Sequence, residues 1–384
     1  MSNVKIKVGF LSREDPCDKK AWSGTIYQLY KNIQTIQNVE VLWIPIKRKI
    51  IYEKLMKIFM GILSRIFFKK KSEHLIFYSK ILAKDINHHL LDDIDIVFAP
   101  SGSVNIAYLK IKKPIIYLTD STFHLLYNYY PIFSNFFSFN VKQGNVIEKK
   151  AADNSTTIIV SSDWAKNSFI NDYKIPEKKI KVIEFGANID NIKVNPKFNF
   201  QKTGQLNLLF LGVDWERKGG KIAVECLSYL NGNNIKSILQ VVGVDPPMKY
   251  KNDNNIKSYG FLNKNLDKDY NLLKEIIYNS DLLILPTKAE CSAIVFSEAS
   301  AYGLPILTYD TGGIPNYVIN GQNGYRLNLK CGGKEFAEKI LEIIHLKELN
   351  KLREGSFAIY KQKLNWECWK TKFMNVINEI TESK

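Results

Sequence analysis

The sequence has few cysteines and no long run of hydrophobic residues. The five cysteines are an odd number and form no Cys-x-x-Cys pair: they are Cys17, Cys226, Cys291, Cys331 and Cys368. This excludes a disulfide-rich scaffold and a zinc module and favours a reducing compartment. Apolar stretches such as 58–63, with six residues, fall far short of the about 20 needed to span a bilayer. Because the N-terminal residues show no signal-peptide pattern, a cytoplasmic location is expected.

Acidic residues are outnumbered by basic ones. The 384 residues include 54 Lys and Arg against 38 Asp and Glu, a formal net charge of +16. The stretch Lys47–Lys71 has nine basic residues and one acid, Glu53, and so holds half of this charge. Its apolar residues recur every three or four positions, as in a helix that lies on an anionic membrane. The alternative is a helix packed on its own domain. Nucleic acid is not expected, because aromatic residues are not interleaved with the bases.

Short runs of Val, Ile, Leu and Phe alternate with helical patterns along the chain. Such runs are typical of strands buried on both faces of a parallel sheet. Examples are 94–99, 115–118, 157–160, 208–211, 239–242, 282–285 and 305–309. The polar stretch 195–204 separates two series of these runs. We therefore predict an α/β protein with two doubly wound, Rossmann-like parallel-sheet domains that face a central cleft.

Two glutamates, Glu290 and Glu298, follow the predicted strand 282–285. Glu290 lies in a short loop, and a helix is expected to begin near Ser292. If both glutamates were helical, about 12 Å would separate them, which is too far for acid and base work at one glycosidic bond. We interpret them as acceptors that contact different parts of one long ligand. Backbone amides near Ser292 and Ala293 would favour an anion between them.

Arg217 and Lys218 follow another predicted strand, 208–211, at a glycine-rich helix start. Cations at this position can neutralise a diphosphate as it leaves. A pair of solvated charges is the alternative interpretation.

The motifs, and the order in which they follow one another along the chain, resemble those of the retaining glycosyltransferases of family 4, which have the GT-B fold. The resemblance rests on Glu290-x7-Glu298, on Gly-Leu-Pro at 303–305 and on Gly-Gly-Ile-Pro at 312–315. It extends to the segments 22–25, 161–165, 185–188, 215–220 and 320–324. It implies transfer of a sugar from a nucleotide sugar, UDP- or GDP-linked, to a hydroxyl acceptor with retention at the anomeric carbon. It implies no enzyme nucleophile, no cofactor and no metal.

The resemblance also implies a domain plan and a cellular role. An acceptor-binding domain would cover 1–195 and a nucleotide-sugar-binding domain 196–365. A C-terminal helix within 366–384 would pack back toward the first domain. The acceptor would be a glycan or lipid-linked, in the assembly of cell-surface glycan, lipopolysaccharide or glycolipid. The protein would lie on the cytoplasmic face of the membrane.

The resemblance assigns the donor to particular residues. Glu290 would bind hydroxyls of the sugar, and Glu298 the ribose, since two acceptor oxygens suit a vicinal diol. The turn that contains Phe261 would meet the nucleobase through its backbone. The further donor contacts implied are Gly24, Arg217, Lys218, Cys291, Ser292 and Ala293.

Two catalytic positions depart from the family pattern. Lys218 matches the lysine of the family pattern. The pattern also has an arginine, but Val213 and Asp214 stand at its usual place here, and the nearby Arg217 would take over its role. The predicted strand 115–119 ends at Asp120, where many members have a histidine. Asp120 could hydrogen-bond the sugar or the acceptor, or could only cap a helix that starts at Ser121. One turn later, His124 could face the same site or be structural.

Two Asp-x-Asp triplets remain, at 93–95 and 267–269. Such triplets bind metal in the other main glycosyltransferase fold, where they follow a strand. Here the first precedes a predicted strand and the second is expected in a polar loop, so both are interpreted as surface charge. Two other functions stay open: a nucleotide-sugar epimerase on the same fold, and a non-catalytic basic protein that binds nucleic acid or lipid.

Overall fold

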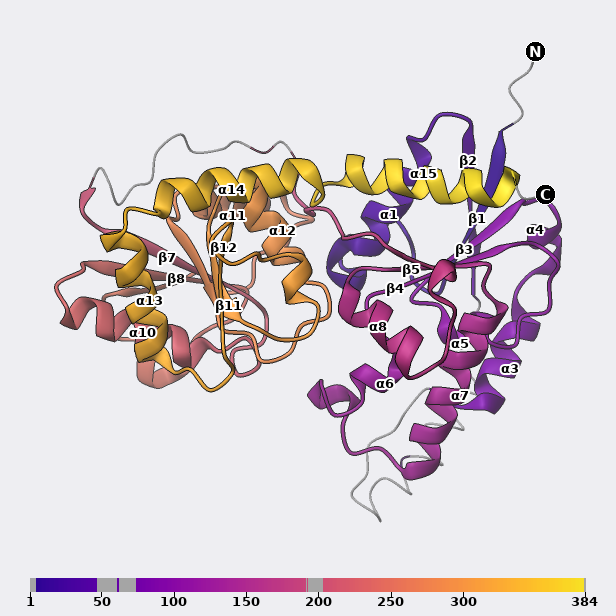
Figure 1. Ribbon diagram of the computed structural model, residues 1–384, viewed down its shortest axis with the longest axis horizontal. Helices are drawn as coiled ribbons and strands as arrows, with labels where there is room; N and C mark the ends of the chain where they lie inside the picture. The colour runs from indigo at the N-terminus through magenta and orange to yellow at the C-terminus, as the bar shows by residue number, and fades with distance from the viewer. Residues whose placement is uncertain (1–4, 47–60, 62–73, 191, 193–202, 383–384) are drawn as a thin grey trace. The chain divides into compact units, whose positions relative to one another are not determined.

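The computed structural model describes residues 5–46, 61, 74–190, 192 and 203–382. The chain divides into two compact units (Figure 1). Unit 1 comprises Met1–Ile183 and Lys370–Lys384, and unit 2 comprises Glu184–Trp369. Nearly all of the basic stretch Lys47–Lys71 and most of the predicted connection 195–204 lie outside the described residues. No helix in the described ranges is long and apolar enough to cross a membrane.

Unit 1 contains a six-stranded parallel sheet in the order β2-β1-β3-β4-β5-β6. The strands are β1 (Ile6–Ser12), β2 (Val39–Pro45), β3 (Ile96–Pro100), β4 (Ile115–Thr119), β5 (Thr157–Val160) and β6 (Ile180–Val182). The strand order reverses between β1 and β3. In open α/β sheets, ligands bind outside the carboxyl ends of the strands at such a reversal.

The helices of unit 1 flank this sheet (Figure 1). The α-helices are α1 (Thr25–Gln34), α3 (Ile76–Asp85), α4 (His88–Asp92), α5 (Ser103–Ile106), α6 (Phe123–Leu126), α7 (Ser138–Asn154) and α8 (Asp163–Asn171). The 3-10 helices are η1 (Ala21–Gly24), η2 (Pro131–Phe133) and η3 (Glu177–Lys179).

Unit 2 contains a second six-stranded parallel sheet, in the order β12-β11-β10-β7-β8-β9. The strands are β7 (Leu206–Leu211), β8 (Ser237–Val242), β9 (Ile256–Ser258), β10 (Leu282–Leu285), β11 (Ile306–Tyr309) and β12 (Gly324–Leu327). Here the order reverses between β7 and β10, which pair at Leu208 with Leu282 and at Leu209 with Leu283. This is the strand order of dinucleotide-binding Rossmann folds.

The helices of unit 2 flank its sheet, with α10 packed beside α13 and α12 beside α14. The α-helices are α10 (Gly220–Gly232), α11 (Asp267–Tyr278), α12 (Ile294–Ala301), α13 (Gly333–His345) and α14 (Leu349–Gln362). The 3-10 helices are η4 (Met248–Tyr250) and η5 (Ile314–Asn316).

The predicted α/β class and the two parallel sheets are confirmed. Each predicted apolar run overlaps a strand whose ends lie within two residues of the prediction. Strands β3, β4, β5, β10 and β11 are buried at every position, because helices cover both faces of each sheet.

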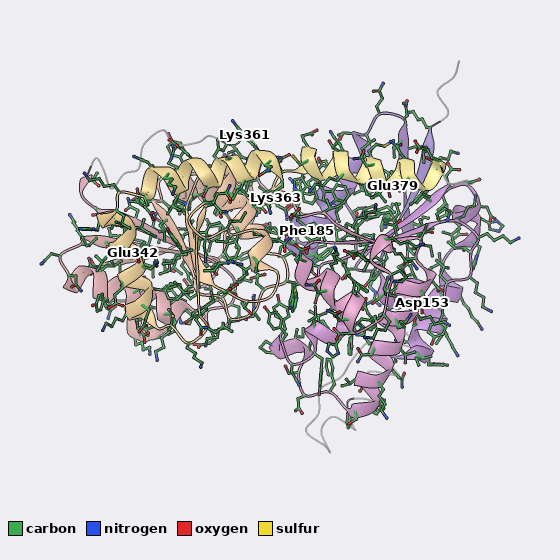
Figure 2. All side chains as sticks on the ribbon, in the orientation of Figure 1. Asp153, Phe185, Glu342, Lys361, Lys363 and Glu379 are labelled. Carbon is green, nitrogen blue, oxygen red and sulfur yellow. The ribbon has the colours of Figure 1, made fainter. Side chains whose placement is uncertain are left out.

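The C-terminal helix α15 (Trp366–Glu382) contributes residues to both units. In unit 2, Trp366 stacks on Phe185 with ring centroids 6.3 Å apart. In unit 1, the Phe373 ring lies 5.0 Å from that of Phe98. Toward the end of the helix, Glu379 (Figure 2) forms an ion pair with Lys181, whose Nζ lies 2.7 Å from the Glu379 Oε2. The apolar face of α15 therefore packs against residues of its own chain.

Candidate functional site

Two loops meet at the strand-order reversal of unit 2. One follows β7 and leads into α10, and the other follows β10 and leads into α12. The Lys288 N–H donates to the carbonyl of Arg217 at 2.9 Å, and the Arg217 Nη1 donates to the carbonyl of Ala289 at 2.9 Å. These two hydrogen bonds hold the loops side by side at the edge where the fold favours ligand binding.

Glycine allows this close approach. Gly219 has a φ of +78°, and a Cβ there would lie 2.2 Å from the carbonyl oxygen of Pro286 in the other loop. At Gly220 a Cβ would lie 2.3 Å from the Trp215 ring. Any side chain at Gly219 would meet backbone and would also be strained by the positive φ.

The loops bring four charged side chains together. The Lys218 Nζ donates to the Glu290 Oε2, and both side chains are buried. The Arg217 Nη1 lies 3.6 Å from the same oxygen, and its Nε lies 3.4 Å from the Asp214 Oδ2. Lys218 and Glu290 would be costly to bury without a partner of opposite sign. Lys218 and Glu290, predicted from separate motifs, thus share one site.

The second glutamate is held by a lysine that the sequence reasoning missed. Glu298, on α12, is 3% exposed. Its Oε1 lies 2.5 Å from the Nζ of Lys264, a residue of the loop that follows β9. No motif marks Lys264, and only its position three residues after Phe261 associates it with the predicted nucleobase turn. The two glutamates therefore lie on different elements, and each is paired with its own lysine.

The turn with Phe261 is joined to the end of β8. Gly260 has a φ of +62°, and its carbonyl accepts the Gly243 N–H at 2.8 Å. A Cβ at Gly243 would lie 2.6 Å from the Gly212 carbonyl oxygen, which follows β7. The backbone of the turn therefore lies close to the loop that carries Lys218, while the Phe261 side chain is exposed.

Helix α12 begins at Ile294, two residues later than predicted. The reason is local: the Ile294 N–H bonds to the Ser292 carbonyl at 3.0 Å, so Ser292 and Ala293 form a turn before the helix. Cys291 and Ala293 are buried. The Gly313 N–H donates to the Glu290 carbonyl at 3.0 Å. The Gly-Gly-Ile-Pro motif therefore supports the backbone of Glu290.

In unit 1, Gly24 immediately precedes α1 in a strained segment. Trp22, Ser23 and Gly24 have φ values of +48°, +57° and +86°. Non-glycine residues rarely adopt such angles, and they persist only where the surrounding structure enforces them.

Asp120 directly follows β4, but it does not cap a helix at Ser121, and that alternative is wrong. The Thr119 Oγ1 donates to the Ser121 carbonyl at 2.7 Å, which keeps this segment in a turn. Helix α6 begins at Phe123, and its cap is Thr122, whose Oγ1 accepts from the Leu125 N–H at 3.3 Å. Asp120 remains a candidate for ligand contact.

The contacts of His124 favour a structural role for this residue over a role in the site. Its Nε2 lies 3.8 Å from the Asp172 Oδ1, and its backbone N–H donates to the Tyr173 hydroxyl at 3.0 Å. Asp172 in turn accepts from the Ser168 Oγ at 2.6 Å. This network fixes α6 against α8.

The Asp-x-Asp triplets have structural roles. Asp95 accepts the Lys7 N–H at 2.9 Å and so helps to join β3 to β1. Asp267 and Asp269 were expected in a polar loop, which is wrong: they form the first turn of α11, where acidic side chains favour the helix dipole. The described residues contain no cluster of three or more side chains that could hold a metal ion.

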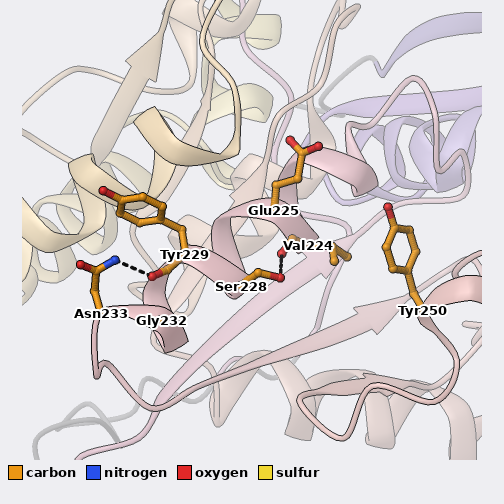
Figure 3. A pocket seen from close by; sticks show the side chains of 7 residues that line it. All are labelled: Val224, Glu225, Ser228, Tyr229, Gly232, Asn233 and Tyr250. Atoms are coloured by element: carbon orange, nitrogen blue, oxygen red, sulfur yellow. Dashed lines mark hydrogen bonds between the residues drawn. The ribbon is translucent and has the colours of Figure 1, made fainter.

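A pocket of about 560 Å³ is lined mainly by residues of α10 (Figure 3). Its lining includes Glu225, Ser228, Tyr229, Asn233 and Tyr250. None of the predicted site residues lines it, so it is separate from the Lys218 and Glu290 pair.

The family model described as glycosyl transferases group 1 matches residues 191–355, which include Arg217, Lys218, Lys264, Glu290 and Glu298. The uncharacterized glycosyltransferase MJ1178 of Methanocaldococcus jannaschii is 25% identical over 247 residues, which cover 63% of this chain and 65% of that protein. The lipopolysaccharide 1,2-N-acetylglucosaminetransferase of Salmonella typhimurium is 26% identical over 243 residues, covering 58% and 62%. The chain thus spans slightly less than two thirds of the length of these relatives.

The fold is shared with solved structures. A glycosyltransferase from Rickettsia africae ESF-5 matches 99% of this chain and 100% of its own, with a TM-score of 0.65 and 16% sequence identity. Anabaena Alr3699/HepE in complex with UDP and glucose matches 97% of this chain and 99% of its own, with a TM-score of 0.63 and 15% sequence identity. The chain therefore has the α/β fold of the GT-B glycosyltransferases, with two parallel sheets.

Proposed function

We propose that this protein is a glycosyltransferase that moves a sugar from a nucleoside diphosphate to a hydroxyl acceptor. The observation that carries the proposal is the Lys218–Glu290 pair, buried at the strand-order reversal of unit 2. The match of residues 191–355 to group 1 glycosyltransferases and the names of the relatives support it.

The charges suggest how the donor is held. Lys218 and Arg217 would exchange their contact with Glu290 for the donor diphosphate, which offers them stronger opposite charge. The carboxylate of Glu290 would then accept from sugar hydroxyls, and that of Glu298 from the ribose. The backbone at Cys291, Ser292 and Ala293 would lie along the sugar and phosphate. The backbone beside Phe261 would meet the base of a UDP- or GDP-linked donor.

For the chemistry, we propose retention at the anomeric carbon without an enzyme nucleophile. The leaving phosphate would take the acceptor's proton, while Arg217 and Lys218 stabilise the charge that develops on it. Two basic side chains supply this charge without a metal ion. From unit 1, Gly24 would approach the reacting sugar with its backbone, and Asp120 would accept from a hydroxyl of the sugar or acceptor.

The acceptor would be a glycan or lipid-linked molecule in polysaccharide or lipopolysaccharide assembly. The Salmonella typhimurium relative described above is named for lipopolysaccharide. We propose that the basic stretch Lys47–Lys71 brings the enzyme to the cytoplasmic face of an anionic membrane, since each base near such a surface contributes about 1 kcal/mol. Liposome flotation tests this: no binding to anionic lipid, or binding unchanged when these bases are neutralised, would reject it.

A transfer assay over a panel of nucleotide sugars tests the activity. Glu290→Ala should lose transfer, whereas Glu338→Ala, which removes an exposed lysine-paired glutamate of α13, should keep it. Equal activity of the wild type and Glu290→Ala would refute the site. An epimerase would convert the donor without acceptor, and a non-catalytic binding protein would not gain thermal stability from nucleoside diphosphates.

A further inference from the structure

Exposed apolar side chains gather on α7 of unit 1 and on the segment before it. Ile132 is 72% exposed, Phe139 42% and Val146 47%. Phe139, Gln143 and Val146 are four and three residues apart, so they form one stripe along α7. Singly exposed apolar residues are ordinary, but Phe139 and Val146 share one face of α7 on either side of Gln143, and a group of exposed apolar residues indicates an interaction surface.

Helix α3 extends this surface. The Ile76 N–H donates to the Gln143 Oε1 at 2.8 Å, so the start of α3 lies against the stripe on α7. The next residue, Phe77, is 60% exposed. The two helices lie side by side in unit 1 (Figure 1).

The same two helices carry exposed basic residues. The Nζ atoms of Lys80 on α3 and Lys150 on α7 lie 5.4 and 5.2 Å from the ring centroid of Tyr108, so their charges converge. Lys84 and Lys142 are exposed and add to them, whereas Lys149 is paired with Asp153. Two acids of these helices, Asp85 and Asp153, are at least partly exposed, whereas Glu148 is buried. The surface is therefore positively charged as well as apolar.

The segment that leads into α7 is uncharged and aromatic, and Phe139 is the exposed one among its aromatic side chains. Residues 125–139 contain no charged side chain and seven aromatic residues: Tyr127, Tyr129, Tyr130, Phe133, Phe136, Phe137 and Phe139. The three tyrosines have one polar end, and such side chains concentrate where apolar and aqueous phases meet. The basic stretch ends at Lys71, three residues before His74, whose ring lies 4.7 Å from that of Phe123.

We propose that this surface, formed by α3, α7 and Ile132 of η2, docks on an anionic lipid bilayer. Ile132, Phe139 and Phe77 would enter the boundary between headgroups and acyl chains, and the lysines would extend their ammonium groups to lipid phosphates. Binding at an interface grows with buried apolar area and with attraction to anionic lipid, and this surface offers both. The inference deepens the membrane association proposed above, but it rests on other residues.

Co-sedimentation with vesicles tests the proposal. Vesicles of phosphatidylcholine with one third phosphatidylglycerol are compared with pure phosphatidylcholine. The variant Ile132→Glu/Phe139→Glu removes two apolar contacts and adds two negative charges. The matched control, Met248→Glu/Leu346→Glu, changes residues of unit 2 that are 76% and 55% exposed. We expect the wild type and the control to bind anionic vesicles equally, and the first variant to bind about tenfold more weakly or worse.

The outcomes separate the proposals. If the wild type binds and Ile132→Glu/Phe139→Glu binds equally well, the surface is wrong while docking through Lys47–Lys71 stands. If the wild type binds no anionic vesicle, both membrane proposals fail, whereas stabilisation by nucleoside diphosphates still tests the donor site. If a short RNA binds through the same residues and displaces the vesicles, the surface recognises nucleic acid and the inference is overturned. Thermal unfolding close to that of the wild type checks that each variant folds.

Discussion

The Lys264 Nζ lies 2.5 Å from the Glu298 Oε1, although 34 residues separate the two in the chain. The pair joins the loop after β9 to helix α12. Glu298 is nearly fully buried, whereas the side chain of Lys264 is 29% exposed. A buried carboxylate needs such a partner, because transfer from water to the interior is costly for an unpaired charge.

Replacing Lys264 by methionine should therefore destabilise unit 2. We expect Lys264→Met to lower the free energy of unfolding by about 1–3 kcal/mol, because Glu298 loses its counter-charge. Urea unfolding measures this. Lys334→Met removes a lysine of an exposed pair on α13 and should change stability little. A Lys264→Met protein as stable as Lys334→Met would show that the pair contributes nothing.

Lys218 should contribute directly to nucleotide affinity. A charge-assisted hydrogen bond to phosphate contributes about 1.5–3 kcal/mol, so Lys218→Ala should weaken binding of UDP or GDP by about ten- to a hundredfold. Titration calorimetry with both nucleotides measures the loss. The double variant Lys218→Ala/Glu290→Gln removes the partner left unpaired, and it should bind the nucleotide no better than Lys218→Ala. If the double variant recovered wild-type affinity, Lys218 would serve only to neutralise Glu290.

Gly219 should tolerate no side chain. Gly219→Ala combines a positive φ with a Cβ placed 2.2 Å from the Pro286 carbonyl oxygen, so the two site loops must separate. We expect loss of stability by more than 1 kcal/mol together with loss of transfer. Gly232→Ala, at the other end of α10, is the matched control. A Cβ there meets nothing within 4 Å, and the change should be neutral or stabilising. Equal behaviour of both variants would contradict the close approach of the loops.

Glu148 should make unit 1 sensitive to pH. Burial raises the pKa of Glu148 from 4.5 to about 7, and its Oε1 accepts from the Tyr117 hydroxyl at 2.9 Å. Because the folded pKa is the higher one, the contribution of Glu148 to stability is complete below about pH 4.5 and is lost as the pH rises to about 7. Glu148→Gln stays neutral and can still accept from Tyr117. Its free energy of unfolding relative to the wild type should therefore increase across this range, and a constant difference would contradict the assignment.

The parallel sheets could be predicted because their strands are continuous apolar runs buried on both faces, as at Leu282–Leu285. The starts of the short helices could not. At Phe123 and Ile294 they depend on turns formed by hydrogen bonds of Thr119 and Ser292. Motif spacing marked Lys218 and Glu290 as site residues. It could not mark Lys264, because the contact with Glu298 depends on how the loop after β9 reaches α12, and no local pattern encodes that distance.

Transfer from a nucleotide sugar tests the central proposal most directly. The measurement is the release of nucleoside diphosphate together with a glycosylated product, over a panel of UDP- and GDP-sugars with a lipid-linked glycan fraction as acceptor. The account predicts turnover with one donor, a loss of at least a hundredfold in Glu290→Gln, and wild-type turnover in Glu338→Gln. Turnover in Glu290→Gln equal to that of the wild type would contradict it.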